Sequence, residues 1–171
     1  MDSDGYLSQL ADIFNGITVN TPSISAIIAI VLAGVLLLAS GFASASEIAF
    51  FSLSPSDRND IDERNHPSDD KISALLGDTE RLLATILITN NFVNVTIIML
   101  CNFFFMNVFV FHSPLAEFLI LTVILTFLLL LFGEIMPKIY SAQKTLTFCR
   151  FSAPGIYFLE KVFRPIATVL V

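Results

Sequence analysis

Glu134 is the residue with the clearest chemical potential, because it follows a long apolar run over residues 118–131. A carboxylate inside a membrane usually faces a bundle interior or a wet cavity and marks an ion or proton path. Pro137 has no amide hydrogen, so in a helix it leaves the carbonyl oxygen of Gly133 without its usual donor. Carboxylate and carbonyl oxygens are ligands for Mg²⁺, Ca²⁺ or Na⁺. This segment therefore predicts one wall of a cation site; the alternative is a proline-kinked helix end with Glu134 neutral or paired with Lys138.

Two further stretches offer uncharged oxygen ligands. Asn90 and Asn94 are four residues apart in an apolar run, so they share one face of a helix. Amide oxygens bind hard cations, although hydrogen bonding between helices is the simpler explanation for asparagine in a membrane. Small residues around Gly41 permit close helix approach, and the hydroxyl of Ser44 or Ser46 can point into the same cavity as the carboxylate.

The composition indicates that apolar helices position these residues. The chain has 171 residues, of which 55% are hydrophobic and 14% are charged, whereas a soluble domain carries about 25% charged residues. About 20 apolar residues cross the hydrocarbon core of a bilayer. We therefore expect an all-α integral membrane protein with three transmembrane helices, drawn from the apolar runs at residues 24–42, 81–111 and 118–131.

The basic residues predict the topology. All nine Lys and Arg residues lie in two windows, residues 58–81 and 138–164. Basic residues near span ends stay on the cytoplasmic side, so we expect the N-terminus outside and the C-terminus inside. Asn90 then lies roughly 13 Å along its helix from the inner end, and Glu134 roughly 6 Å from Lys138. The polar groups of all three helices therefore fall in the cytoplasmic half of the bilayer, which favours one shared site open to the cytoplasm.

These boundaries divide the chain into an outer N-terminal segment, a transmembrane domain and a helical belt at the inner surface. We expect amphipathic helices in the belt, with a break at Pro154 and Gly155. The chain stops within an apolar pattern, so we also expect a cytoplasmic domain to follow Val171. The expected ranges are 1–22 for the outer segment, 23–137 for the transmembrane domain with a cytoplasmic helical insertion at about 54–81, and 138–171 for the juxtamembrane belt.

Three motifs resemble the transmembrane domain of the CorC/CorB and cyclin M (CNNM) family of Mg²⁺ transporters, which includes a bacterial hemolysin-like and gliding-motility-associated branch. They are SASEIAF at residues 44–50, LATILITNNFVN at 83–94 and GEIMPK at 133–138. The resemblance implies a homodimer in the bacterial inner membrane and Mg²⁺ export coupled to Na⁺ entry. It also implies downstream CBS modules, through which ATP would bind.

Carried over to this chain, the family pattern implies a Mg²⁺ site with one serine, two asparagines, a carbonyl and a carboxylate. Two serines fit the first position, and Glu47 is a candidate for Na⁺ handling or dimer packing. Gly41 and Pro137 would have structural roles. The implied ligands are Ser44 or Ser46, Asn90, Asn94, the Gly133 carbonyl oxygen and Glu134.

Two functions fit these residues. The first is a cation transporter, for which the oxygen ligands alone admit either Mg²⁺ or Na⁺. The second is a non-transporting membrane scaffold in a secretion or gliding machinery, in which the polar residues only join helices. An intramembrane enzyme is disfavoured, because the chain has no HExxH motif, no paired aspartates in the spans and no Ser/His or Ser/Lys pair at membrane depth. The expected partners are a second copy, the lipid bilayer and the cations, without nucleic acid.

Overall fold

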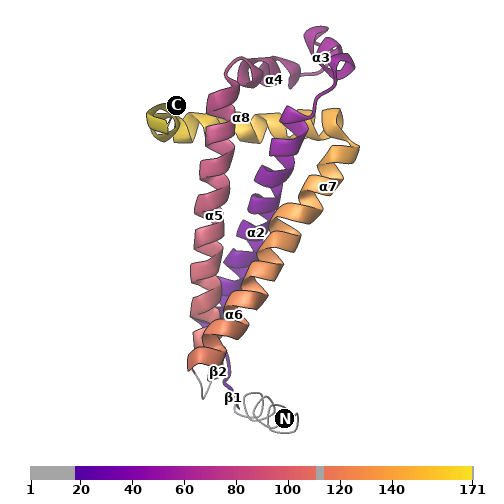
Figure 1. The fold of residues 1–171 in the computed structure, drawn as a ribbon. Helices are drawn as coiled ribbons and strands as arrows, with labels where there is room; N and C mark the ends of the chain where they lie inside the picture. Colours follow the sequence, from indigo (N-terminus) through magenta and orange to yellow (C-terminus); the bar gives the residue numbers. More distant parts are fainter. Residues whose placement is uncertain (1–17, 111–113, 171) are drawn as a thin grey trace, which may run out of the picture.

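The computed structural model describes residues 18–110 and 114–170, with side-chain surroundings for residues 18–110 and 117–166. Three upright helices lie side by side (Figure 1). Each is long and apolar enough to cross a membrane, which confirms the prediction of an all-α membrane domain with three such helices. The first is α2 (Ile24–Phe51), the second is α5 (Thr79–Val108), and the third runs without interruption through α6 (Pro114–Leu128), the π-helical segment η1 (Leu129–Ile135) and α7 (Met136–Gln143).

At one end of the bundle, a short antiparallel pairing joins the first two helices. Strand β1 (Thr18–Val19) precedes α2 and strand β2 (Phe109–Val110) follows α5. Their register pairs Thr18 with Val110. Because α2 begins just after β1 and α5 ends just before β2, this pairing holds the two helix ends together.

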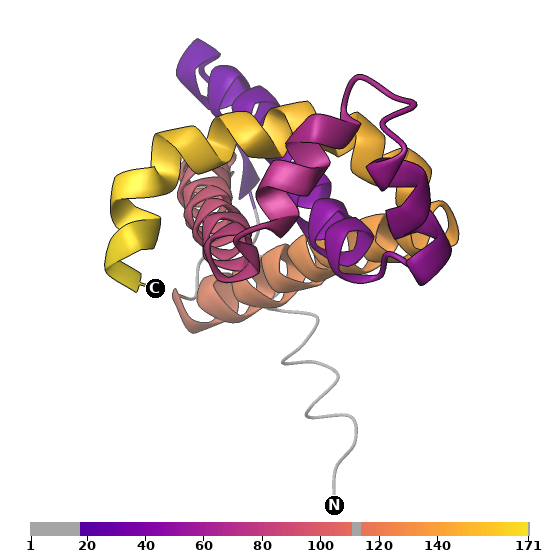
Figure 2. The same ribbon diagram turned by 90° about the horizontal axis from the view of Figure 1, so that it is seen from above.

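The opposite end carries α3 (Pro55–Asp62), α4 (Asp69–Leu76) and α8 (Thr145–Leu170) (Figure 1). Helix α3 begins with a capping box, in which Ser54 and Asp57 satisfy each other's backbone N–H groups. Seen from above, α8 runs across the ends of the upright helices (Figure 2). Both basic windows of the sequence therefore lie at this end of the bundle.

Helix α8 differs from the expected belt, because the chain does not break at Pro154 and Gly155. It stays helical from Thr145 to Leu170, and the break falls instead at Lys144, between α7 and α8. A proline inside a helix removes one hydrogen bond and bends the helix. The helix can still continue past the proline when neighbouring helices pack against it. Packing is close here: a Cβ atom on Gly155 would lie 3.0 Å from Cζ of Phe42 in α2.

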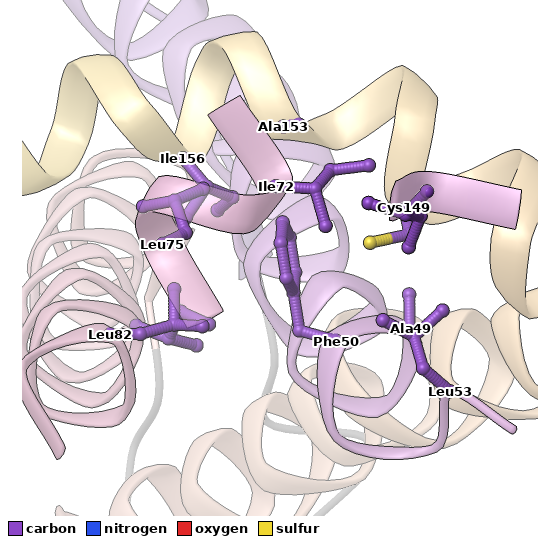
Figure 3. Packing of buried hydrophobic residues seen from close by; sticks show 11 residues of the cluster. Ala49, Phe50, Leu53, Ile72, Leu75, Leu82, Cys149, Ala153 and Ile156 are labelled. Atoms are coloured by element: carbon purple, nitrogen blue, oxygen red, sulfur yellow. The ribbon is translucent and has the colours of Figure 1, made fainter. Parts of the chain in front are cut away.

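An apolar cluster joins α8 to the ends of α2 and α5 and to α3 and α4 (Figure 3). Phe50 lies at its centre and is fully buried. Cys149 belongs to this cluster, and Cys101 belongs to a second one between α2, α5 and α6, so both cysteines are buried and free. The buried members of the first cluster are Ala49, Phe50, Leu53, Ile61, Ile72, Leu75, Leu82, Ile86, Cys149, Ala153 and Ile156.

A buried ion pair ties α4 to α8 beside this cluster. Asp69 is 0% exposed and accepts hydrogen bonds from Nε and an Nη atom of Arg150 at 2.8 and 3.0 Å. Burial acts to raise the pKa of Asp69, but the Arg150 guanidinium and the backbone N–H of His66 together hold it below its usual value. The carboxylate is therefore charged and fully bonded, and it fixes α4 against the belt.

Candidate cation site

Ser40 is the residue at which α2 meets the asparagines of α5. It is fully buried, and its Oγ atom lies 2.8 Å from Oδ1 of Asn90 and 2.7 Å from Oδ1 of Asn94. The two asparagines share a face of α5, as their spacing predicts, and both side chains are partly buried. The structure therefore brings polar groups of two helices to one level, around a serine that the sequence analysis did not select as a ligand.

The third helix approaches the same point through Gly133. A Cβ atom at this position would lie 3.3 Å from Oγ of Ser40, which is a tight contact, so a larger residue would require the hydroxyl to move by a few tenths of an ångström. Gly133 is buried within η1. The structure thus places Gly133 next to the cluster formed by Ser40, Asn90 and Asn94.

Gly41 and Pro137 form a second close contact between the same two helices. A Cβ atom on Gly41 would lie 2.9 Å from Cγ of Pro137 and 3.3 Å from the carbonyl oxygen of Phe132. These distances are shorter than ordinary contacts, so glycine at position 41 lets α2 lie directly against the third helix.

The third helix changes its hydrogen-bond register at this level. In η1 the bonds run five residues back, as from the N–H of Met136 to the carbonyl of Leu131. Pro137 follows immediately and has no amide hydrogen. It therefore cannot donate to the carbonyl of Gly133, four residues back, or of Phe132, five residues back. The loss of the Pro137 donor was predicted from the sequence, whereas the π-helical register was not.

The two serines that were predicted as alternatives have different surroundings. Ser46 donates a hydrogen bond of 2.7 Å to the carbonyl of Phe42 within its own helix, so its hydroxyl hydrogen is already used. Ser44 is fully buried, and within the described residues its Oγ atom has no hydrogen-bond partner. It follows Ser40 by one helical turn and shares its face. Of the two, Ser44 has the hydroxyl free for a further ligand.

Glu134 does not contact the asparagine cluster through any hydrogen bond within the described residues. Its Oε1 atom accepts a hydrogen bond of 3.1 Å from Nζ of Lys138, one turn further along. The same Nζ lies 3.2 Å from Oε2 of Glu47 in α2. The pairing with Lys138, which the sequence left open as an alternative, is thus present, and Lys138 joins two carboxylates from different helices.

The ligand chemistry of this region is oxygen-based and mostly uncharged. Among the described residues, no group of three or more His, Cys, Asp or Glu side chains could hold a metal ion. A site here would combine one hydroxyl, two carboxamide oxygens, a backbone carbonyl and at most a neighbouring carboxylate, which suits hard cations that keep part of their water. Ser40 could have been found from the sequence by its helical spacing, since it precedes Ser44 by four residues.

Comparison with known proteins gives the family. A search of curated proteins found no match. The family described as the cyclin M transmembrane N-terminal domain (CNNM) matches residues 28–171, a range that includes every residue of the candidate site and most of the chain. On this match, with its three apolar helices, the chain belongs to the CNNM transmembrane-domain family.

Proposed function

We propose that this integral membrane domain binds Mg²⁺ between its three long helices and exports it, coupled to Na⁺ entry. The observation that carries the proposal is the convergence of the Asn90 and Asn94 side-chain oxygens on Ser40 Oγ, at 2.8 and 2.7 Å. Membership of a transporter family supports the same function at a coarser level.

The three converging oxygens are short of hydrogens. Ser40 has a single hydroxyl hydrogen, and in the orientation found here both asparagines turn their acceptor atom, Oδ1, toward it. One hydrogen cannot satisfy two acceptors at once, so in this orientation the Ser40 hydroxyl leaves one of the two amide oxygens without a full hydrogen bond from it. A cation coordinated by these oxygens would remove that deficit, since all three have lone pairs to offer.

The remaining ligands are proposed from their position around this cluster. Gly133 packs against Ser40 and has a carbonyl oxygen that Pro137 cannot bond, while Ser44 has a buried hydroxyl without a partner in the described residues. Glu134 is adjacent to Gly133 and would supply the negative charge. We leave out Ser46, because its hydroxyl donates a hydrogen bond to a carbonyl of its own helix. The proposed Mg²⁺ ligands are drawn from Ser40, Ser44, Asn90, Asn94, the Gly133 carbonyl and Glu134.

The orientation and the assembly belong to the same proposal. Both basic windows lie at the end of the bundle that carries α3, α4 and α8, and the positive-inside rule then supports a cytoplasmic location for that end. The site would open to the cytoplasm of a bacterial cell whose inner membrane holds the domain as a homodimer. Control by ATP would act through CBS modules outside this chain.

Mg²⁺ titration of the purified domain, by calorimetry in detergent, tests the proposal. Replacing Asn94 with Ala removes one converging oxygen and is expected to weaken Mg²⁺ binding about tenfold or more, a change of about 1.4 kcal/mol. Asn107→Ala is the matched control, because Asn107 is an exposed asparagine near the other end of the same helix. Equal Mg²⁺ affinities for the two variants would refute the site.

Glu134→Ala separates the transporter from the alternative of a scaffold in which polar residues only join helices. A variant that stays folded and dimeric but loses Mg²⁺ binding supports the site. If the variant binds Mg²⁺ with the affinity of the wild type, Glu134 is not a ligand of the site. Loss of folding without any measurable wild-type binding would favour the scaffold, because the Glu134–Lys138 and Ser40–asparagine contacts would then serve packing alone.

A further inference from the structure

Lys138 holds a central place in a charged group that no ligand assignment explains. Its Nζ atom lies 3.1 Å from Oε1 of Glu134 and 3.2 Å from Oε2 of Glu47. The three residues come from three elements: Glu47 from α2, Glu134 from η1 and Lys138 from α7. Their side chains are 26%, 43% and 27% exposed, so the group is partly shielded from water and its interactions are stronger than those of a surface pair.

The Lys138 ammonium and a divalent cation would use the same carboxylate. A metal ion takes up lone pairs of Glu134, and an ammonium held on the same group must share or give up its contact. Because Lys138 is attached one helical turn away, it competes as an intramolecular partner, with a high effective concentration that does not depend on dilution. A bound cation also meets the positive charge of Nζ at short range, which disfavours binding.

We propose that Lys138 is a built-in competitor of the transported cation, which alternates between Glu134 and Glu47 and so keeps the site from binding its cation too tightly for release. This inference rests on the proposed function of the site. Glu47 is the second position of the lysine: when a cation engages Glu134, Nζ keeps a carboxylate partner 3.2 Å away on α2. When a cation displaces the Lys138 ammonium from Glu134, the ammonium loses that one contact and stays paired with Glu47.

The proposed role of Lys138 and a purely structural role predict opposite changes in cation affinity when the lysine is replaced. If Lys138 only tied α7 to α2 and held Glu134 in place, its loss would loosen the site and weaken cation binding. As a competitor, its loss strengthens cation binding. The two carboxylates also have opposite effects, because removing the charge of Glu47 leaves the lysine with Glu134 alone and strengthens the competition.

The experiment measures Mg²⁺ affinity of the purified domain for the wild type, Lys138→Met and Glu47→Gln, with Lys144→Met as the control. Methionine keeps the length of the lysine chain without its charge. Lys144 is an exposed lysine at the junction of α7 and α8, and within the described residues it forms no ion pair with Glu47 or Glu134. We expect Lys138→Met to bind Mg²⁺ about tenfold more tightly, Glu47→Gln about threefold more weakly, and Lys144→Met within about twofold of the wild type.

The outcomes separate this inference from the proposed function. Mg²⁺ binding by the wild type with equal or weaker binding by Lys138→Met overturns the competition and leaves the site intact. Tighter binding by Lys144→Met, to the same degree as Lys138→Met, also overturns it, because the effect would then be one of general charge. No saturable binding by the wild type overturns both proposals. Should Lys138→Met fail to fold, Lys138→Gln takes its place, because it also removes the ammonium charge: tighter Mg²⁺ binding than the wild type supports the competition, and equal or weaker binding overturns it.

Discussion

Replacing Gly41 with alanine tests the close contact between α2 and the third helix. The added Cβ atom would lie 2.9 Å from Cγ of Pro137, whereas ordinary contacts begin at 3.4 Å, so the two helices must move apart by about 0.5 Å. The obstacles are a proline ring and a backbone carbonyl, that of Phe132, and neither can turn away as a flexible side chain would. Overpacking of this kind costs about 1–3 kcal/mol.

Gly34→Ala is the matched control on the same helix. A Cβ atom on Gly34 meets nothing within 4 Å. Both substitutions bring the same gain in helix propensity, about 1 kcal/mol at most, so that gain cancels when the two variants are compared. The difference in unfolding free energy between them isolates the steric cost, and we expect Gly41→Ala to be less stable by about 1–3 kcal/mol.

Denaturant unfolding of the purified domain, followed by circular dichroism, measures this difference, and a Mg²⁺ titration measures its effect on the site. Separation of α2 from η1 also moves Ser40 away from Gly133, so Gly41→Ala is expected to weaken Mg²⁺ binding while Gly34→Ala leaves it unchanged. Equal stability of the two variants would refute the contact as described. A loss of stability without any change in Mg²⁺ affinity would separate this packing from the cation site.

Three further predictions concern single side chains. Ser40→Ala should lower the unfolding free energy by about 1 kcal/mol through its lost hydrogen bonds and weaken Mg²⁺ binding, whereas Ser46→Ala should stay within about 0.5 kcal/mol of the wild type; denaturant unfolding and calorimetry check both. The folded-state pKa of Asp69 lies below its unfolded value, so its stabilisation is present above about pH 3.9 and is lost as the pH falls through the lowered value; melting curves should show less of this acid loss in Arg150→Met. Burial first, and then the Asp69 carboxylate, raises the pKa of the Cys149 thiol to about 12, so with the other cysteine replaced by alanine, maleimide at pH 8 should label this thiol only after unfolding, as mass spectrometry would show.

Much of the framework can be predicted from the sequence, because a bilayer imposes long apolar runs and the basic residues mark their ends. Asn90 and Asn94 could be placed on one face by spacing alone. The choice among the first-helix serines could not, since it depends on how α2 is rotated against α5, and that rotation follows from packing at Gly41 and Gly133. Spacing shows which residues share a face and leaves open which face meets the neighbouring helix.

Proline illustrates a second limit of prediction from sequence. Pro137 was associated with a carbonyl that loses its donor, but the change to five-residue hydrogen bonds just before it was not predicted. Pro154 was expected to break the belt and instead lies within a continuous helix. The local effect of a proline is the loss of one hydrogen bond, and tertiary packing decides whether the helix ends, bends or changes register.

The pairing of β1 with β2 has a mechanical consequence. Together with the apolar cluster at the other end, it ties α2 and α5 at both extremities, whereas none of the buried members of that cluster comes from the described part of the third helix. Helices α2 and α5 thus form a frame that is tied at both ends, and the third helix packs against this frame through the close contacts at Gly41 and Gly133. Ser40, Asn90 and Asn94 belong to this frame, whereas Gly133 and Glu134 belong to the third helix, so a cation bound as proposed would join the third helix to the frame.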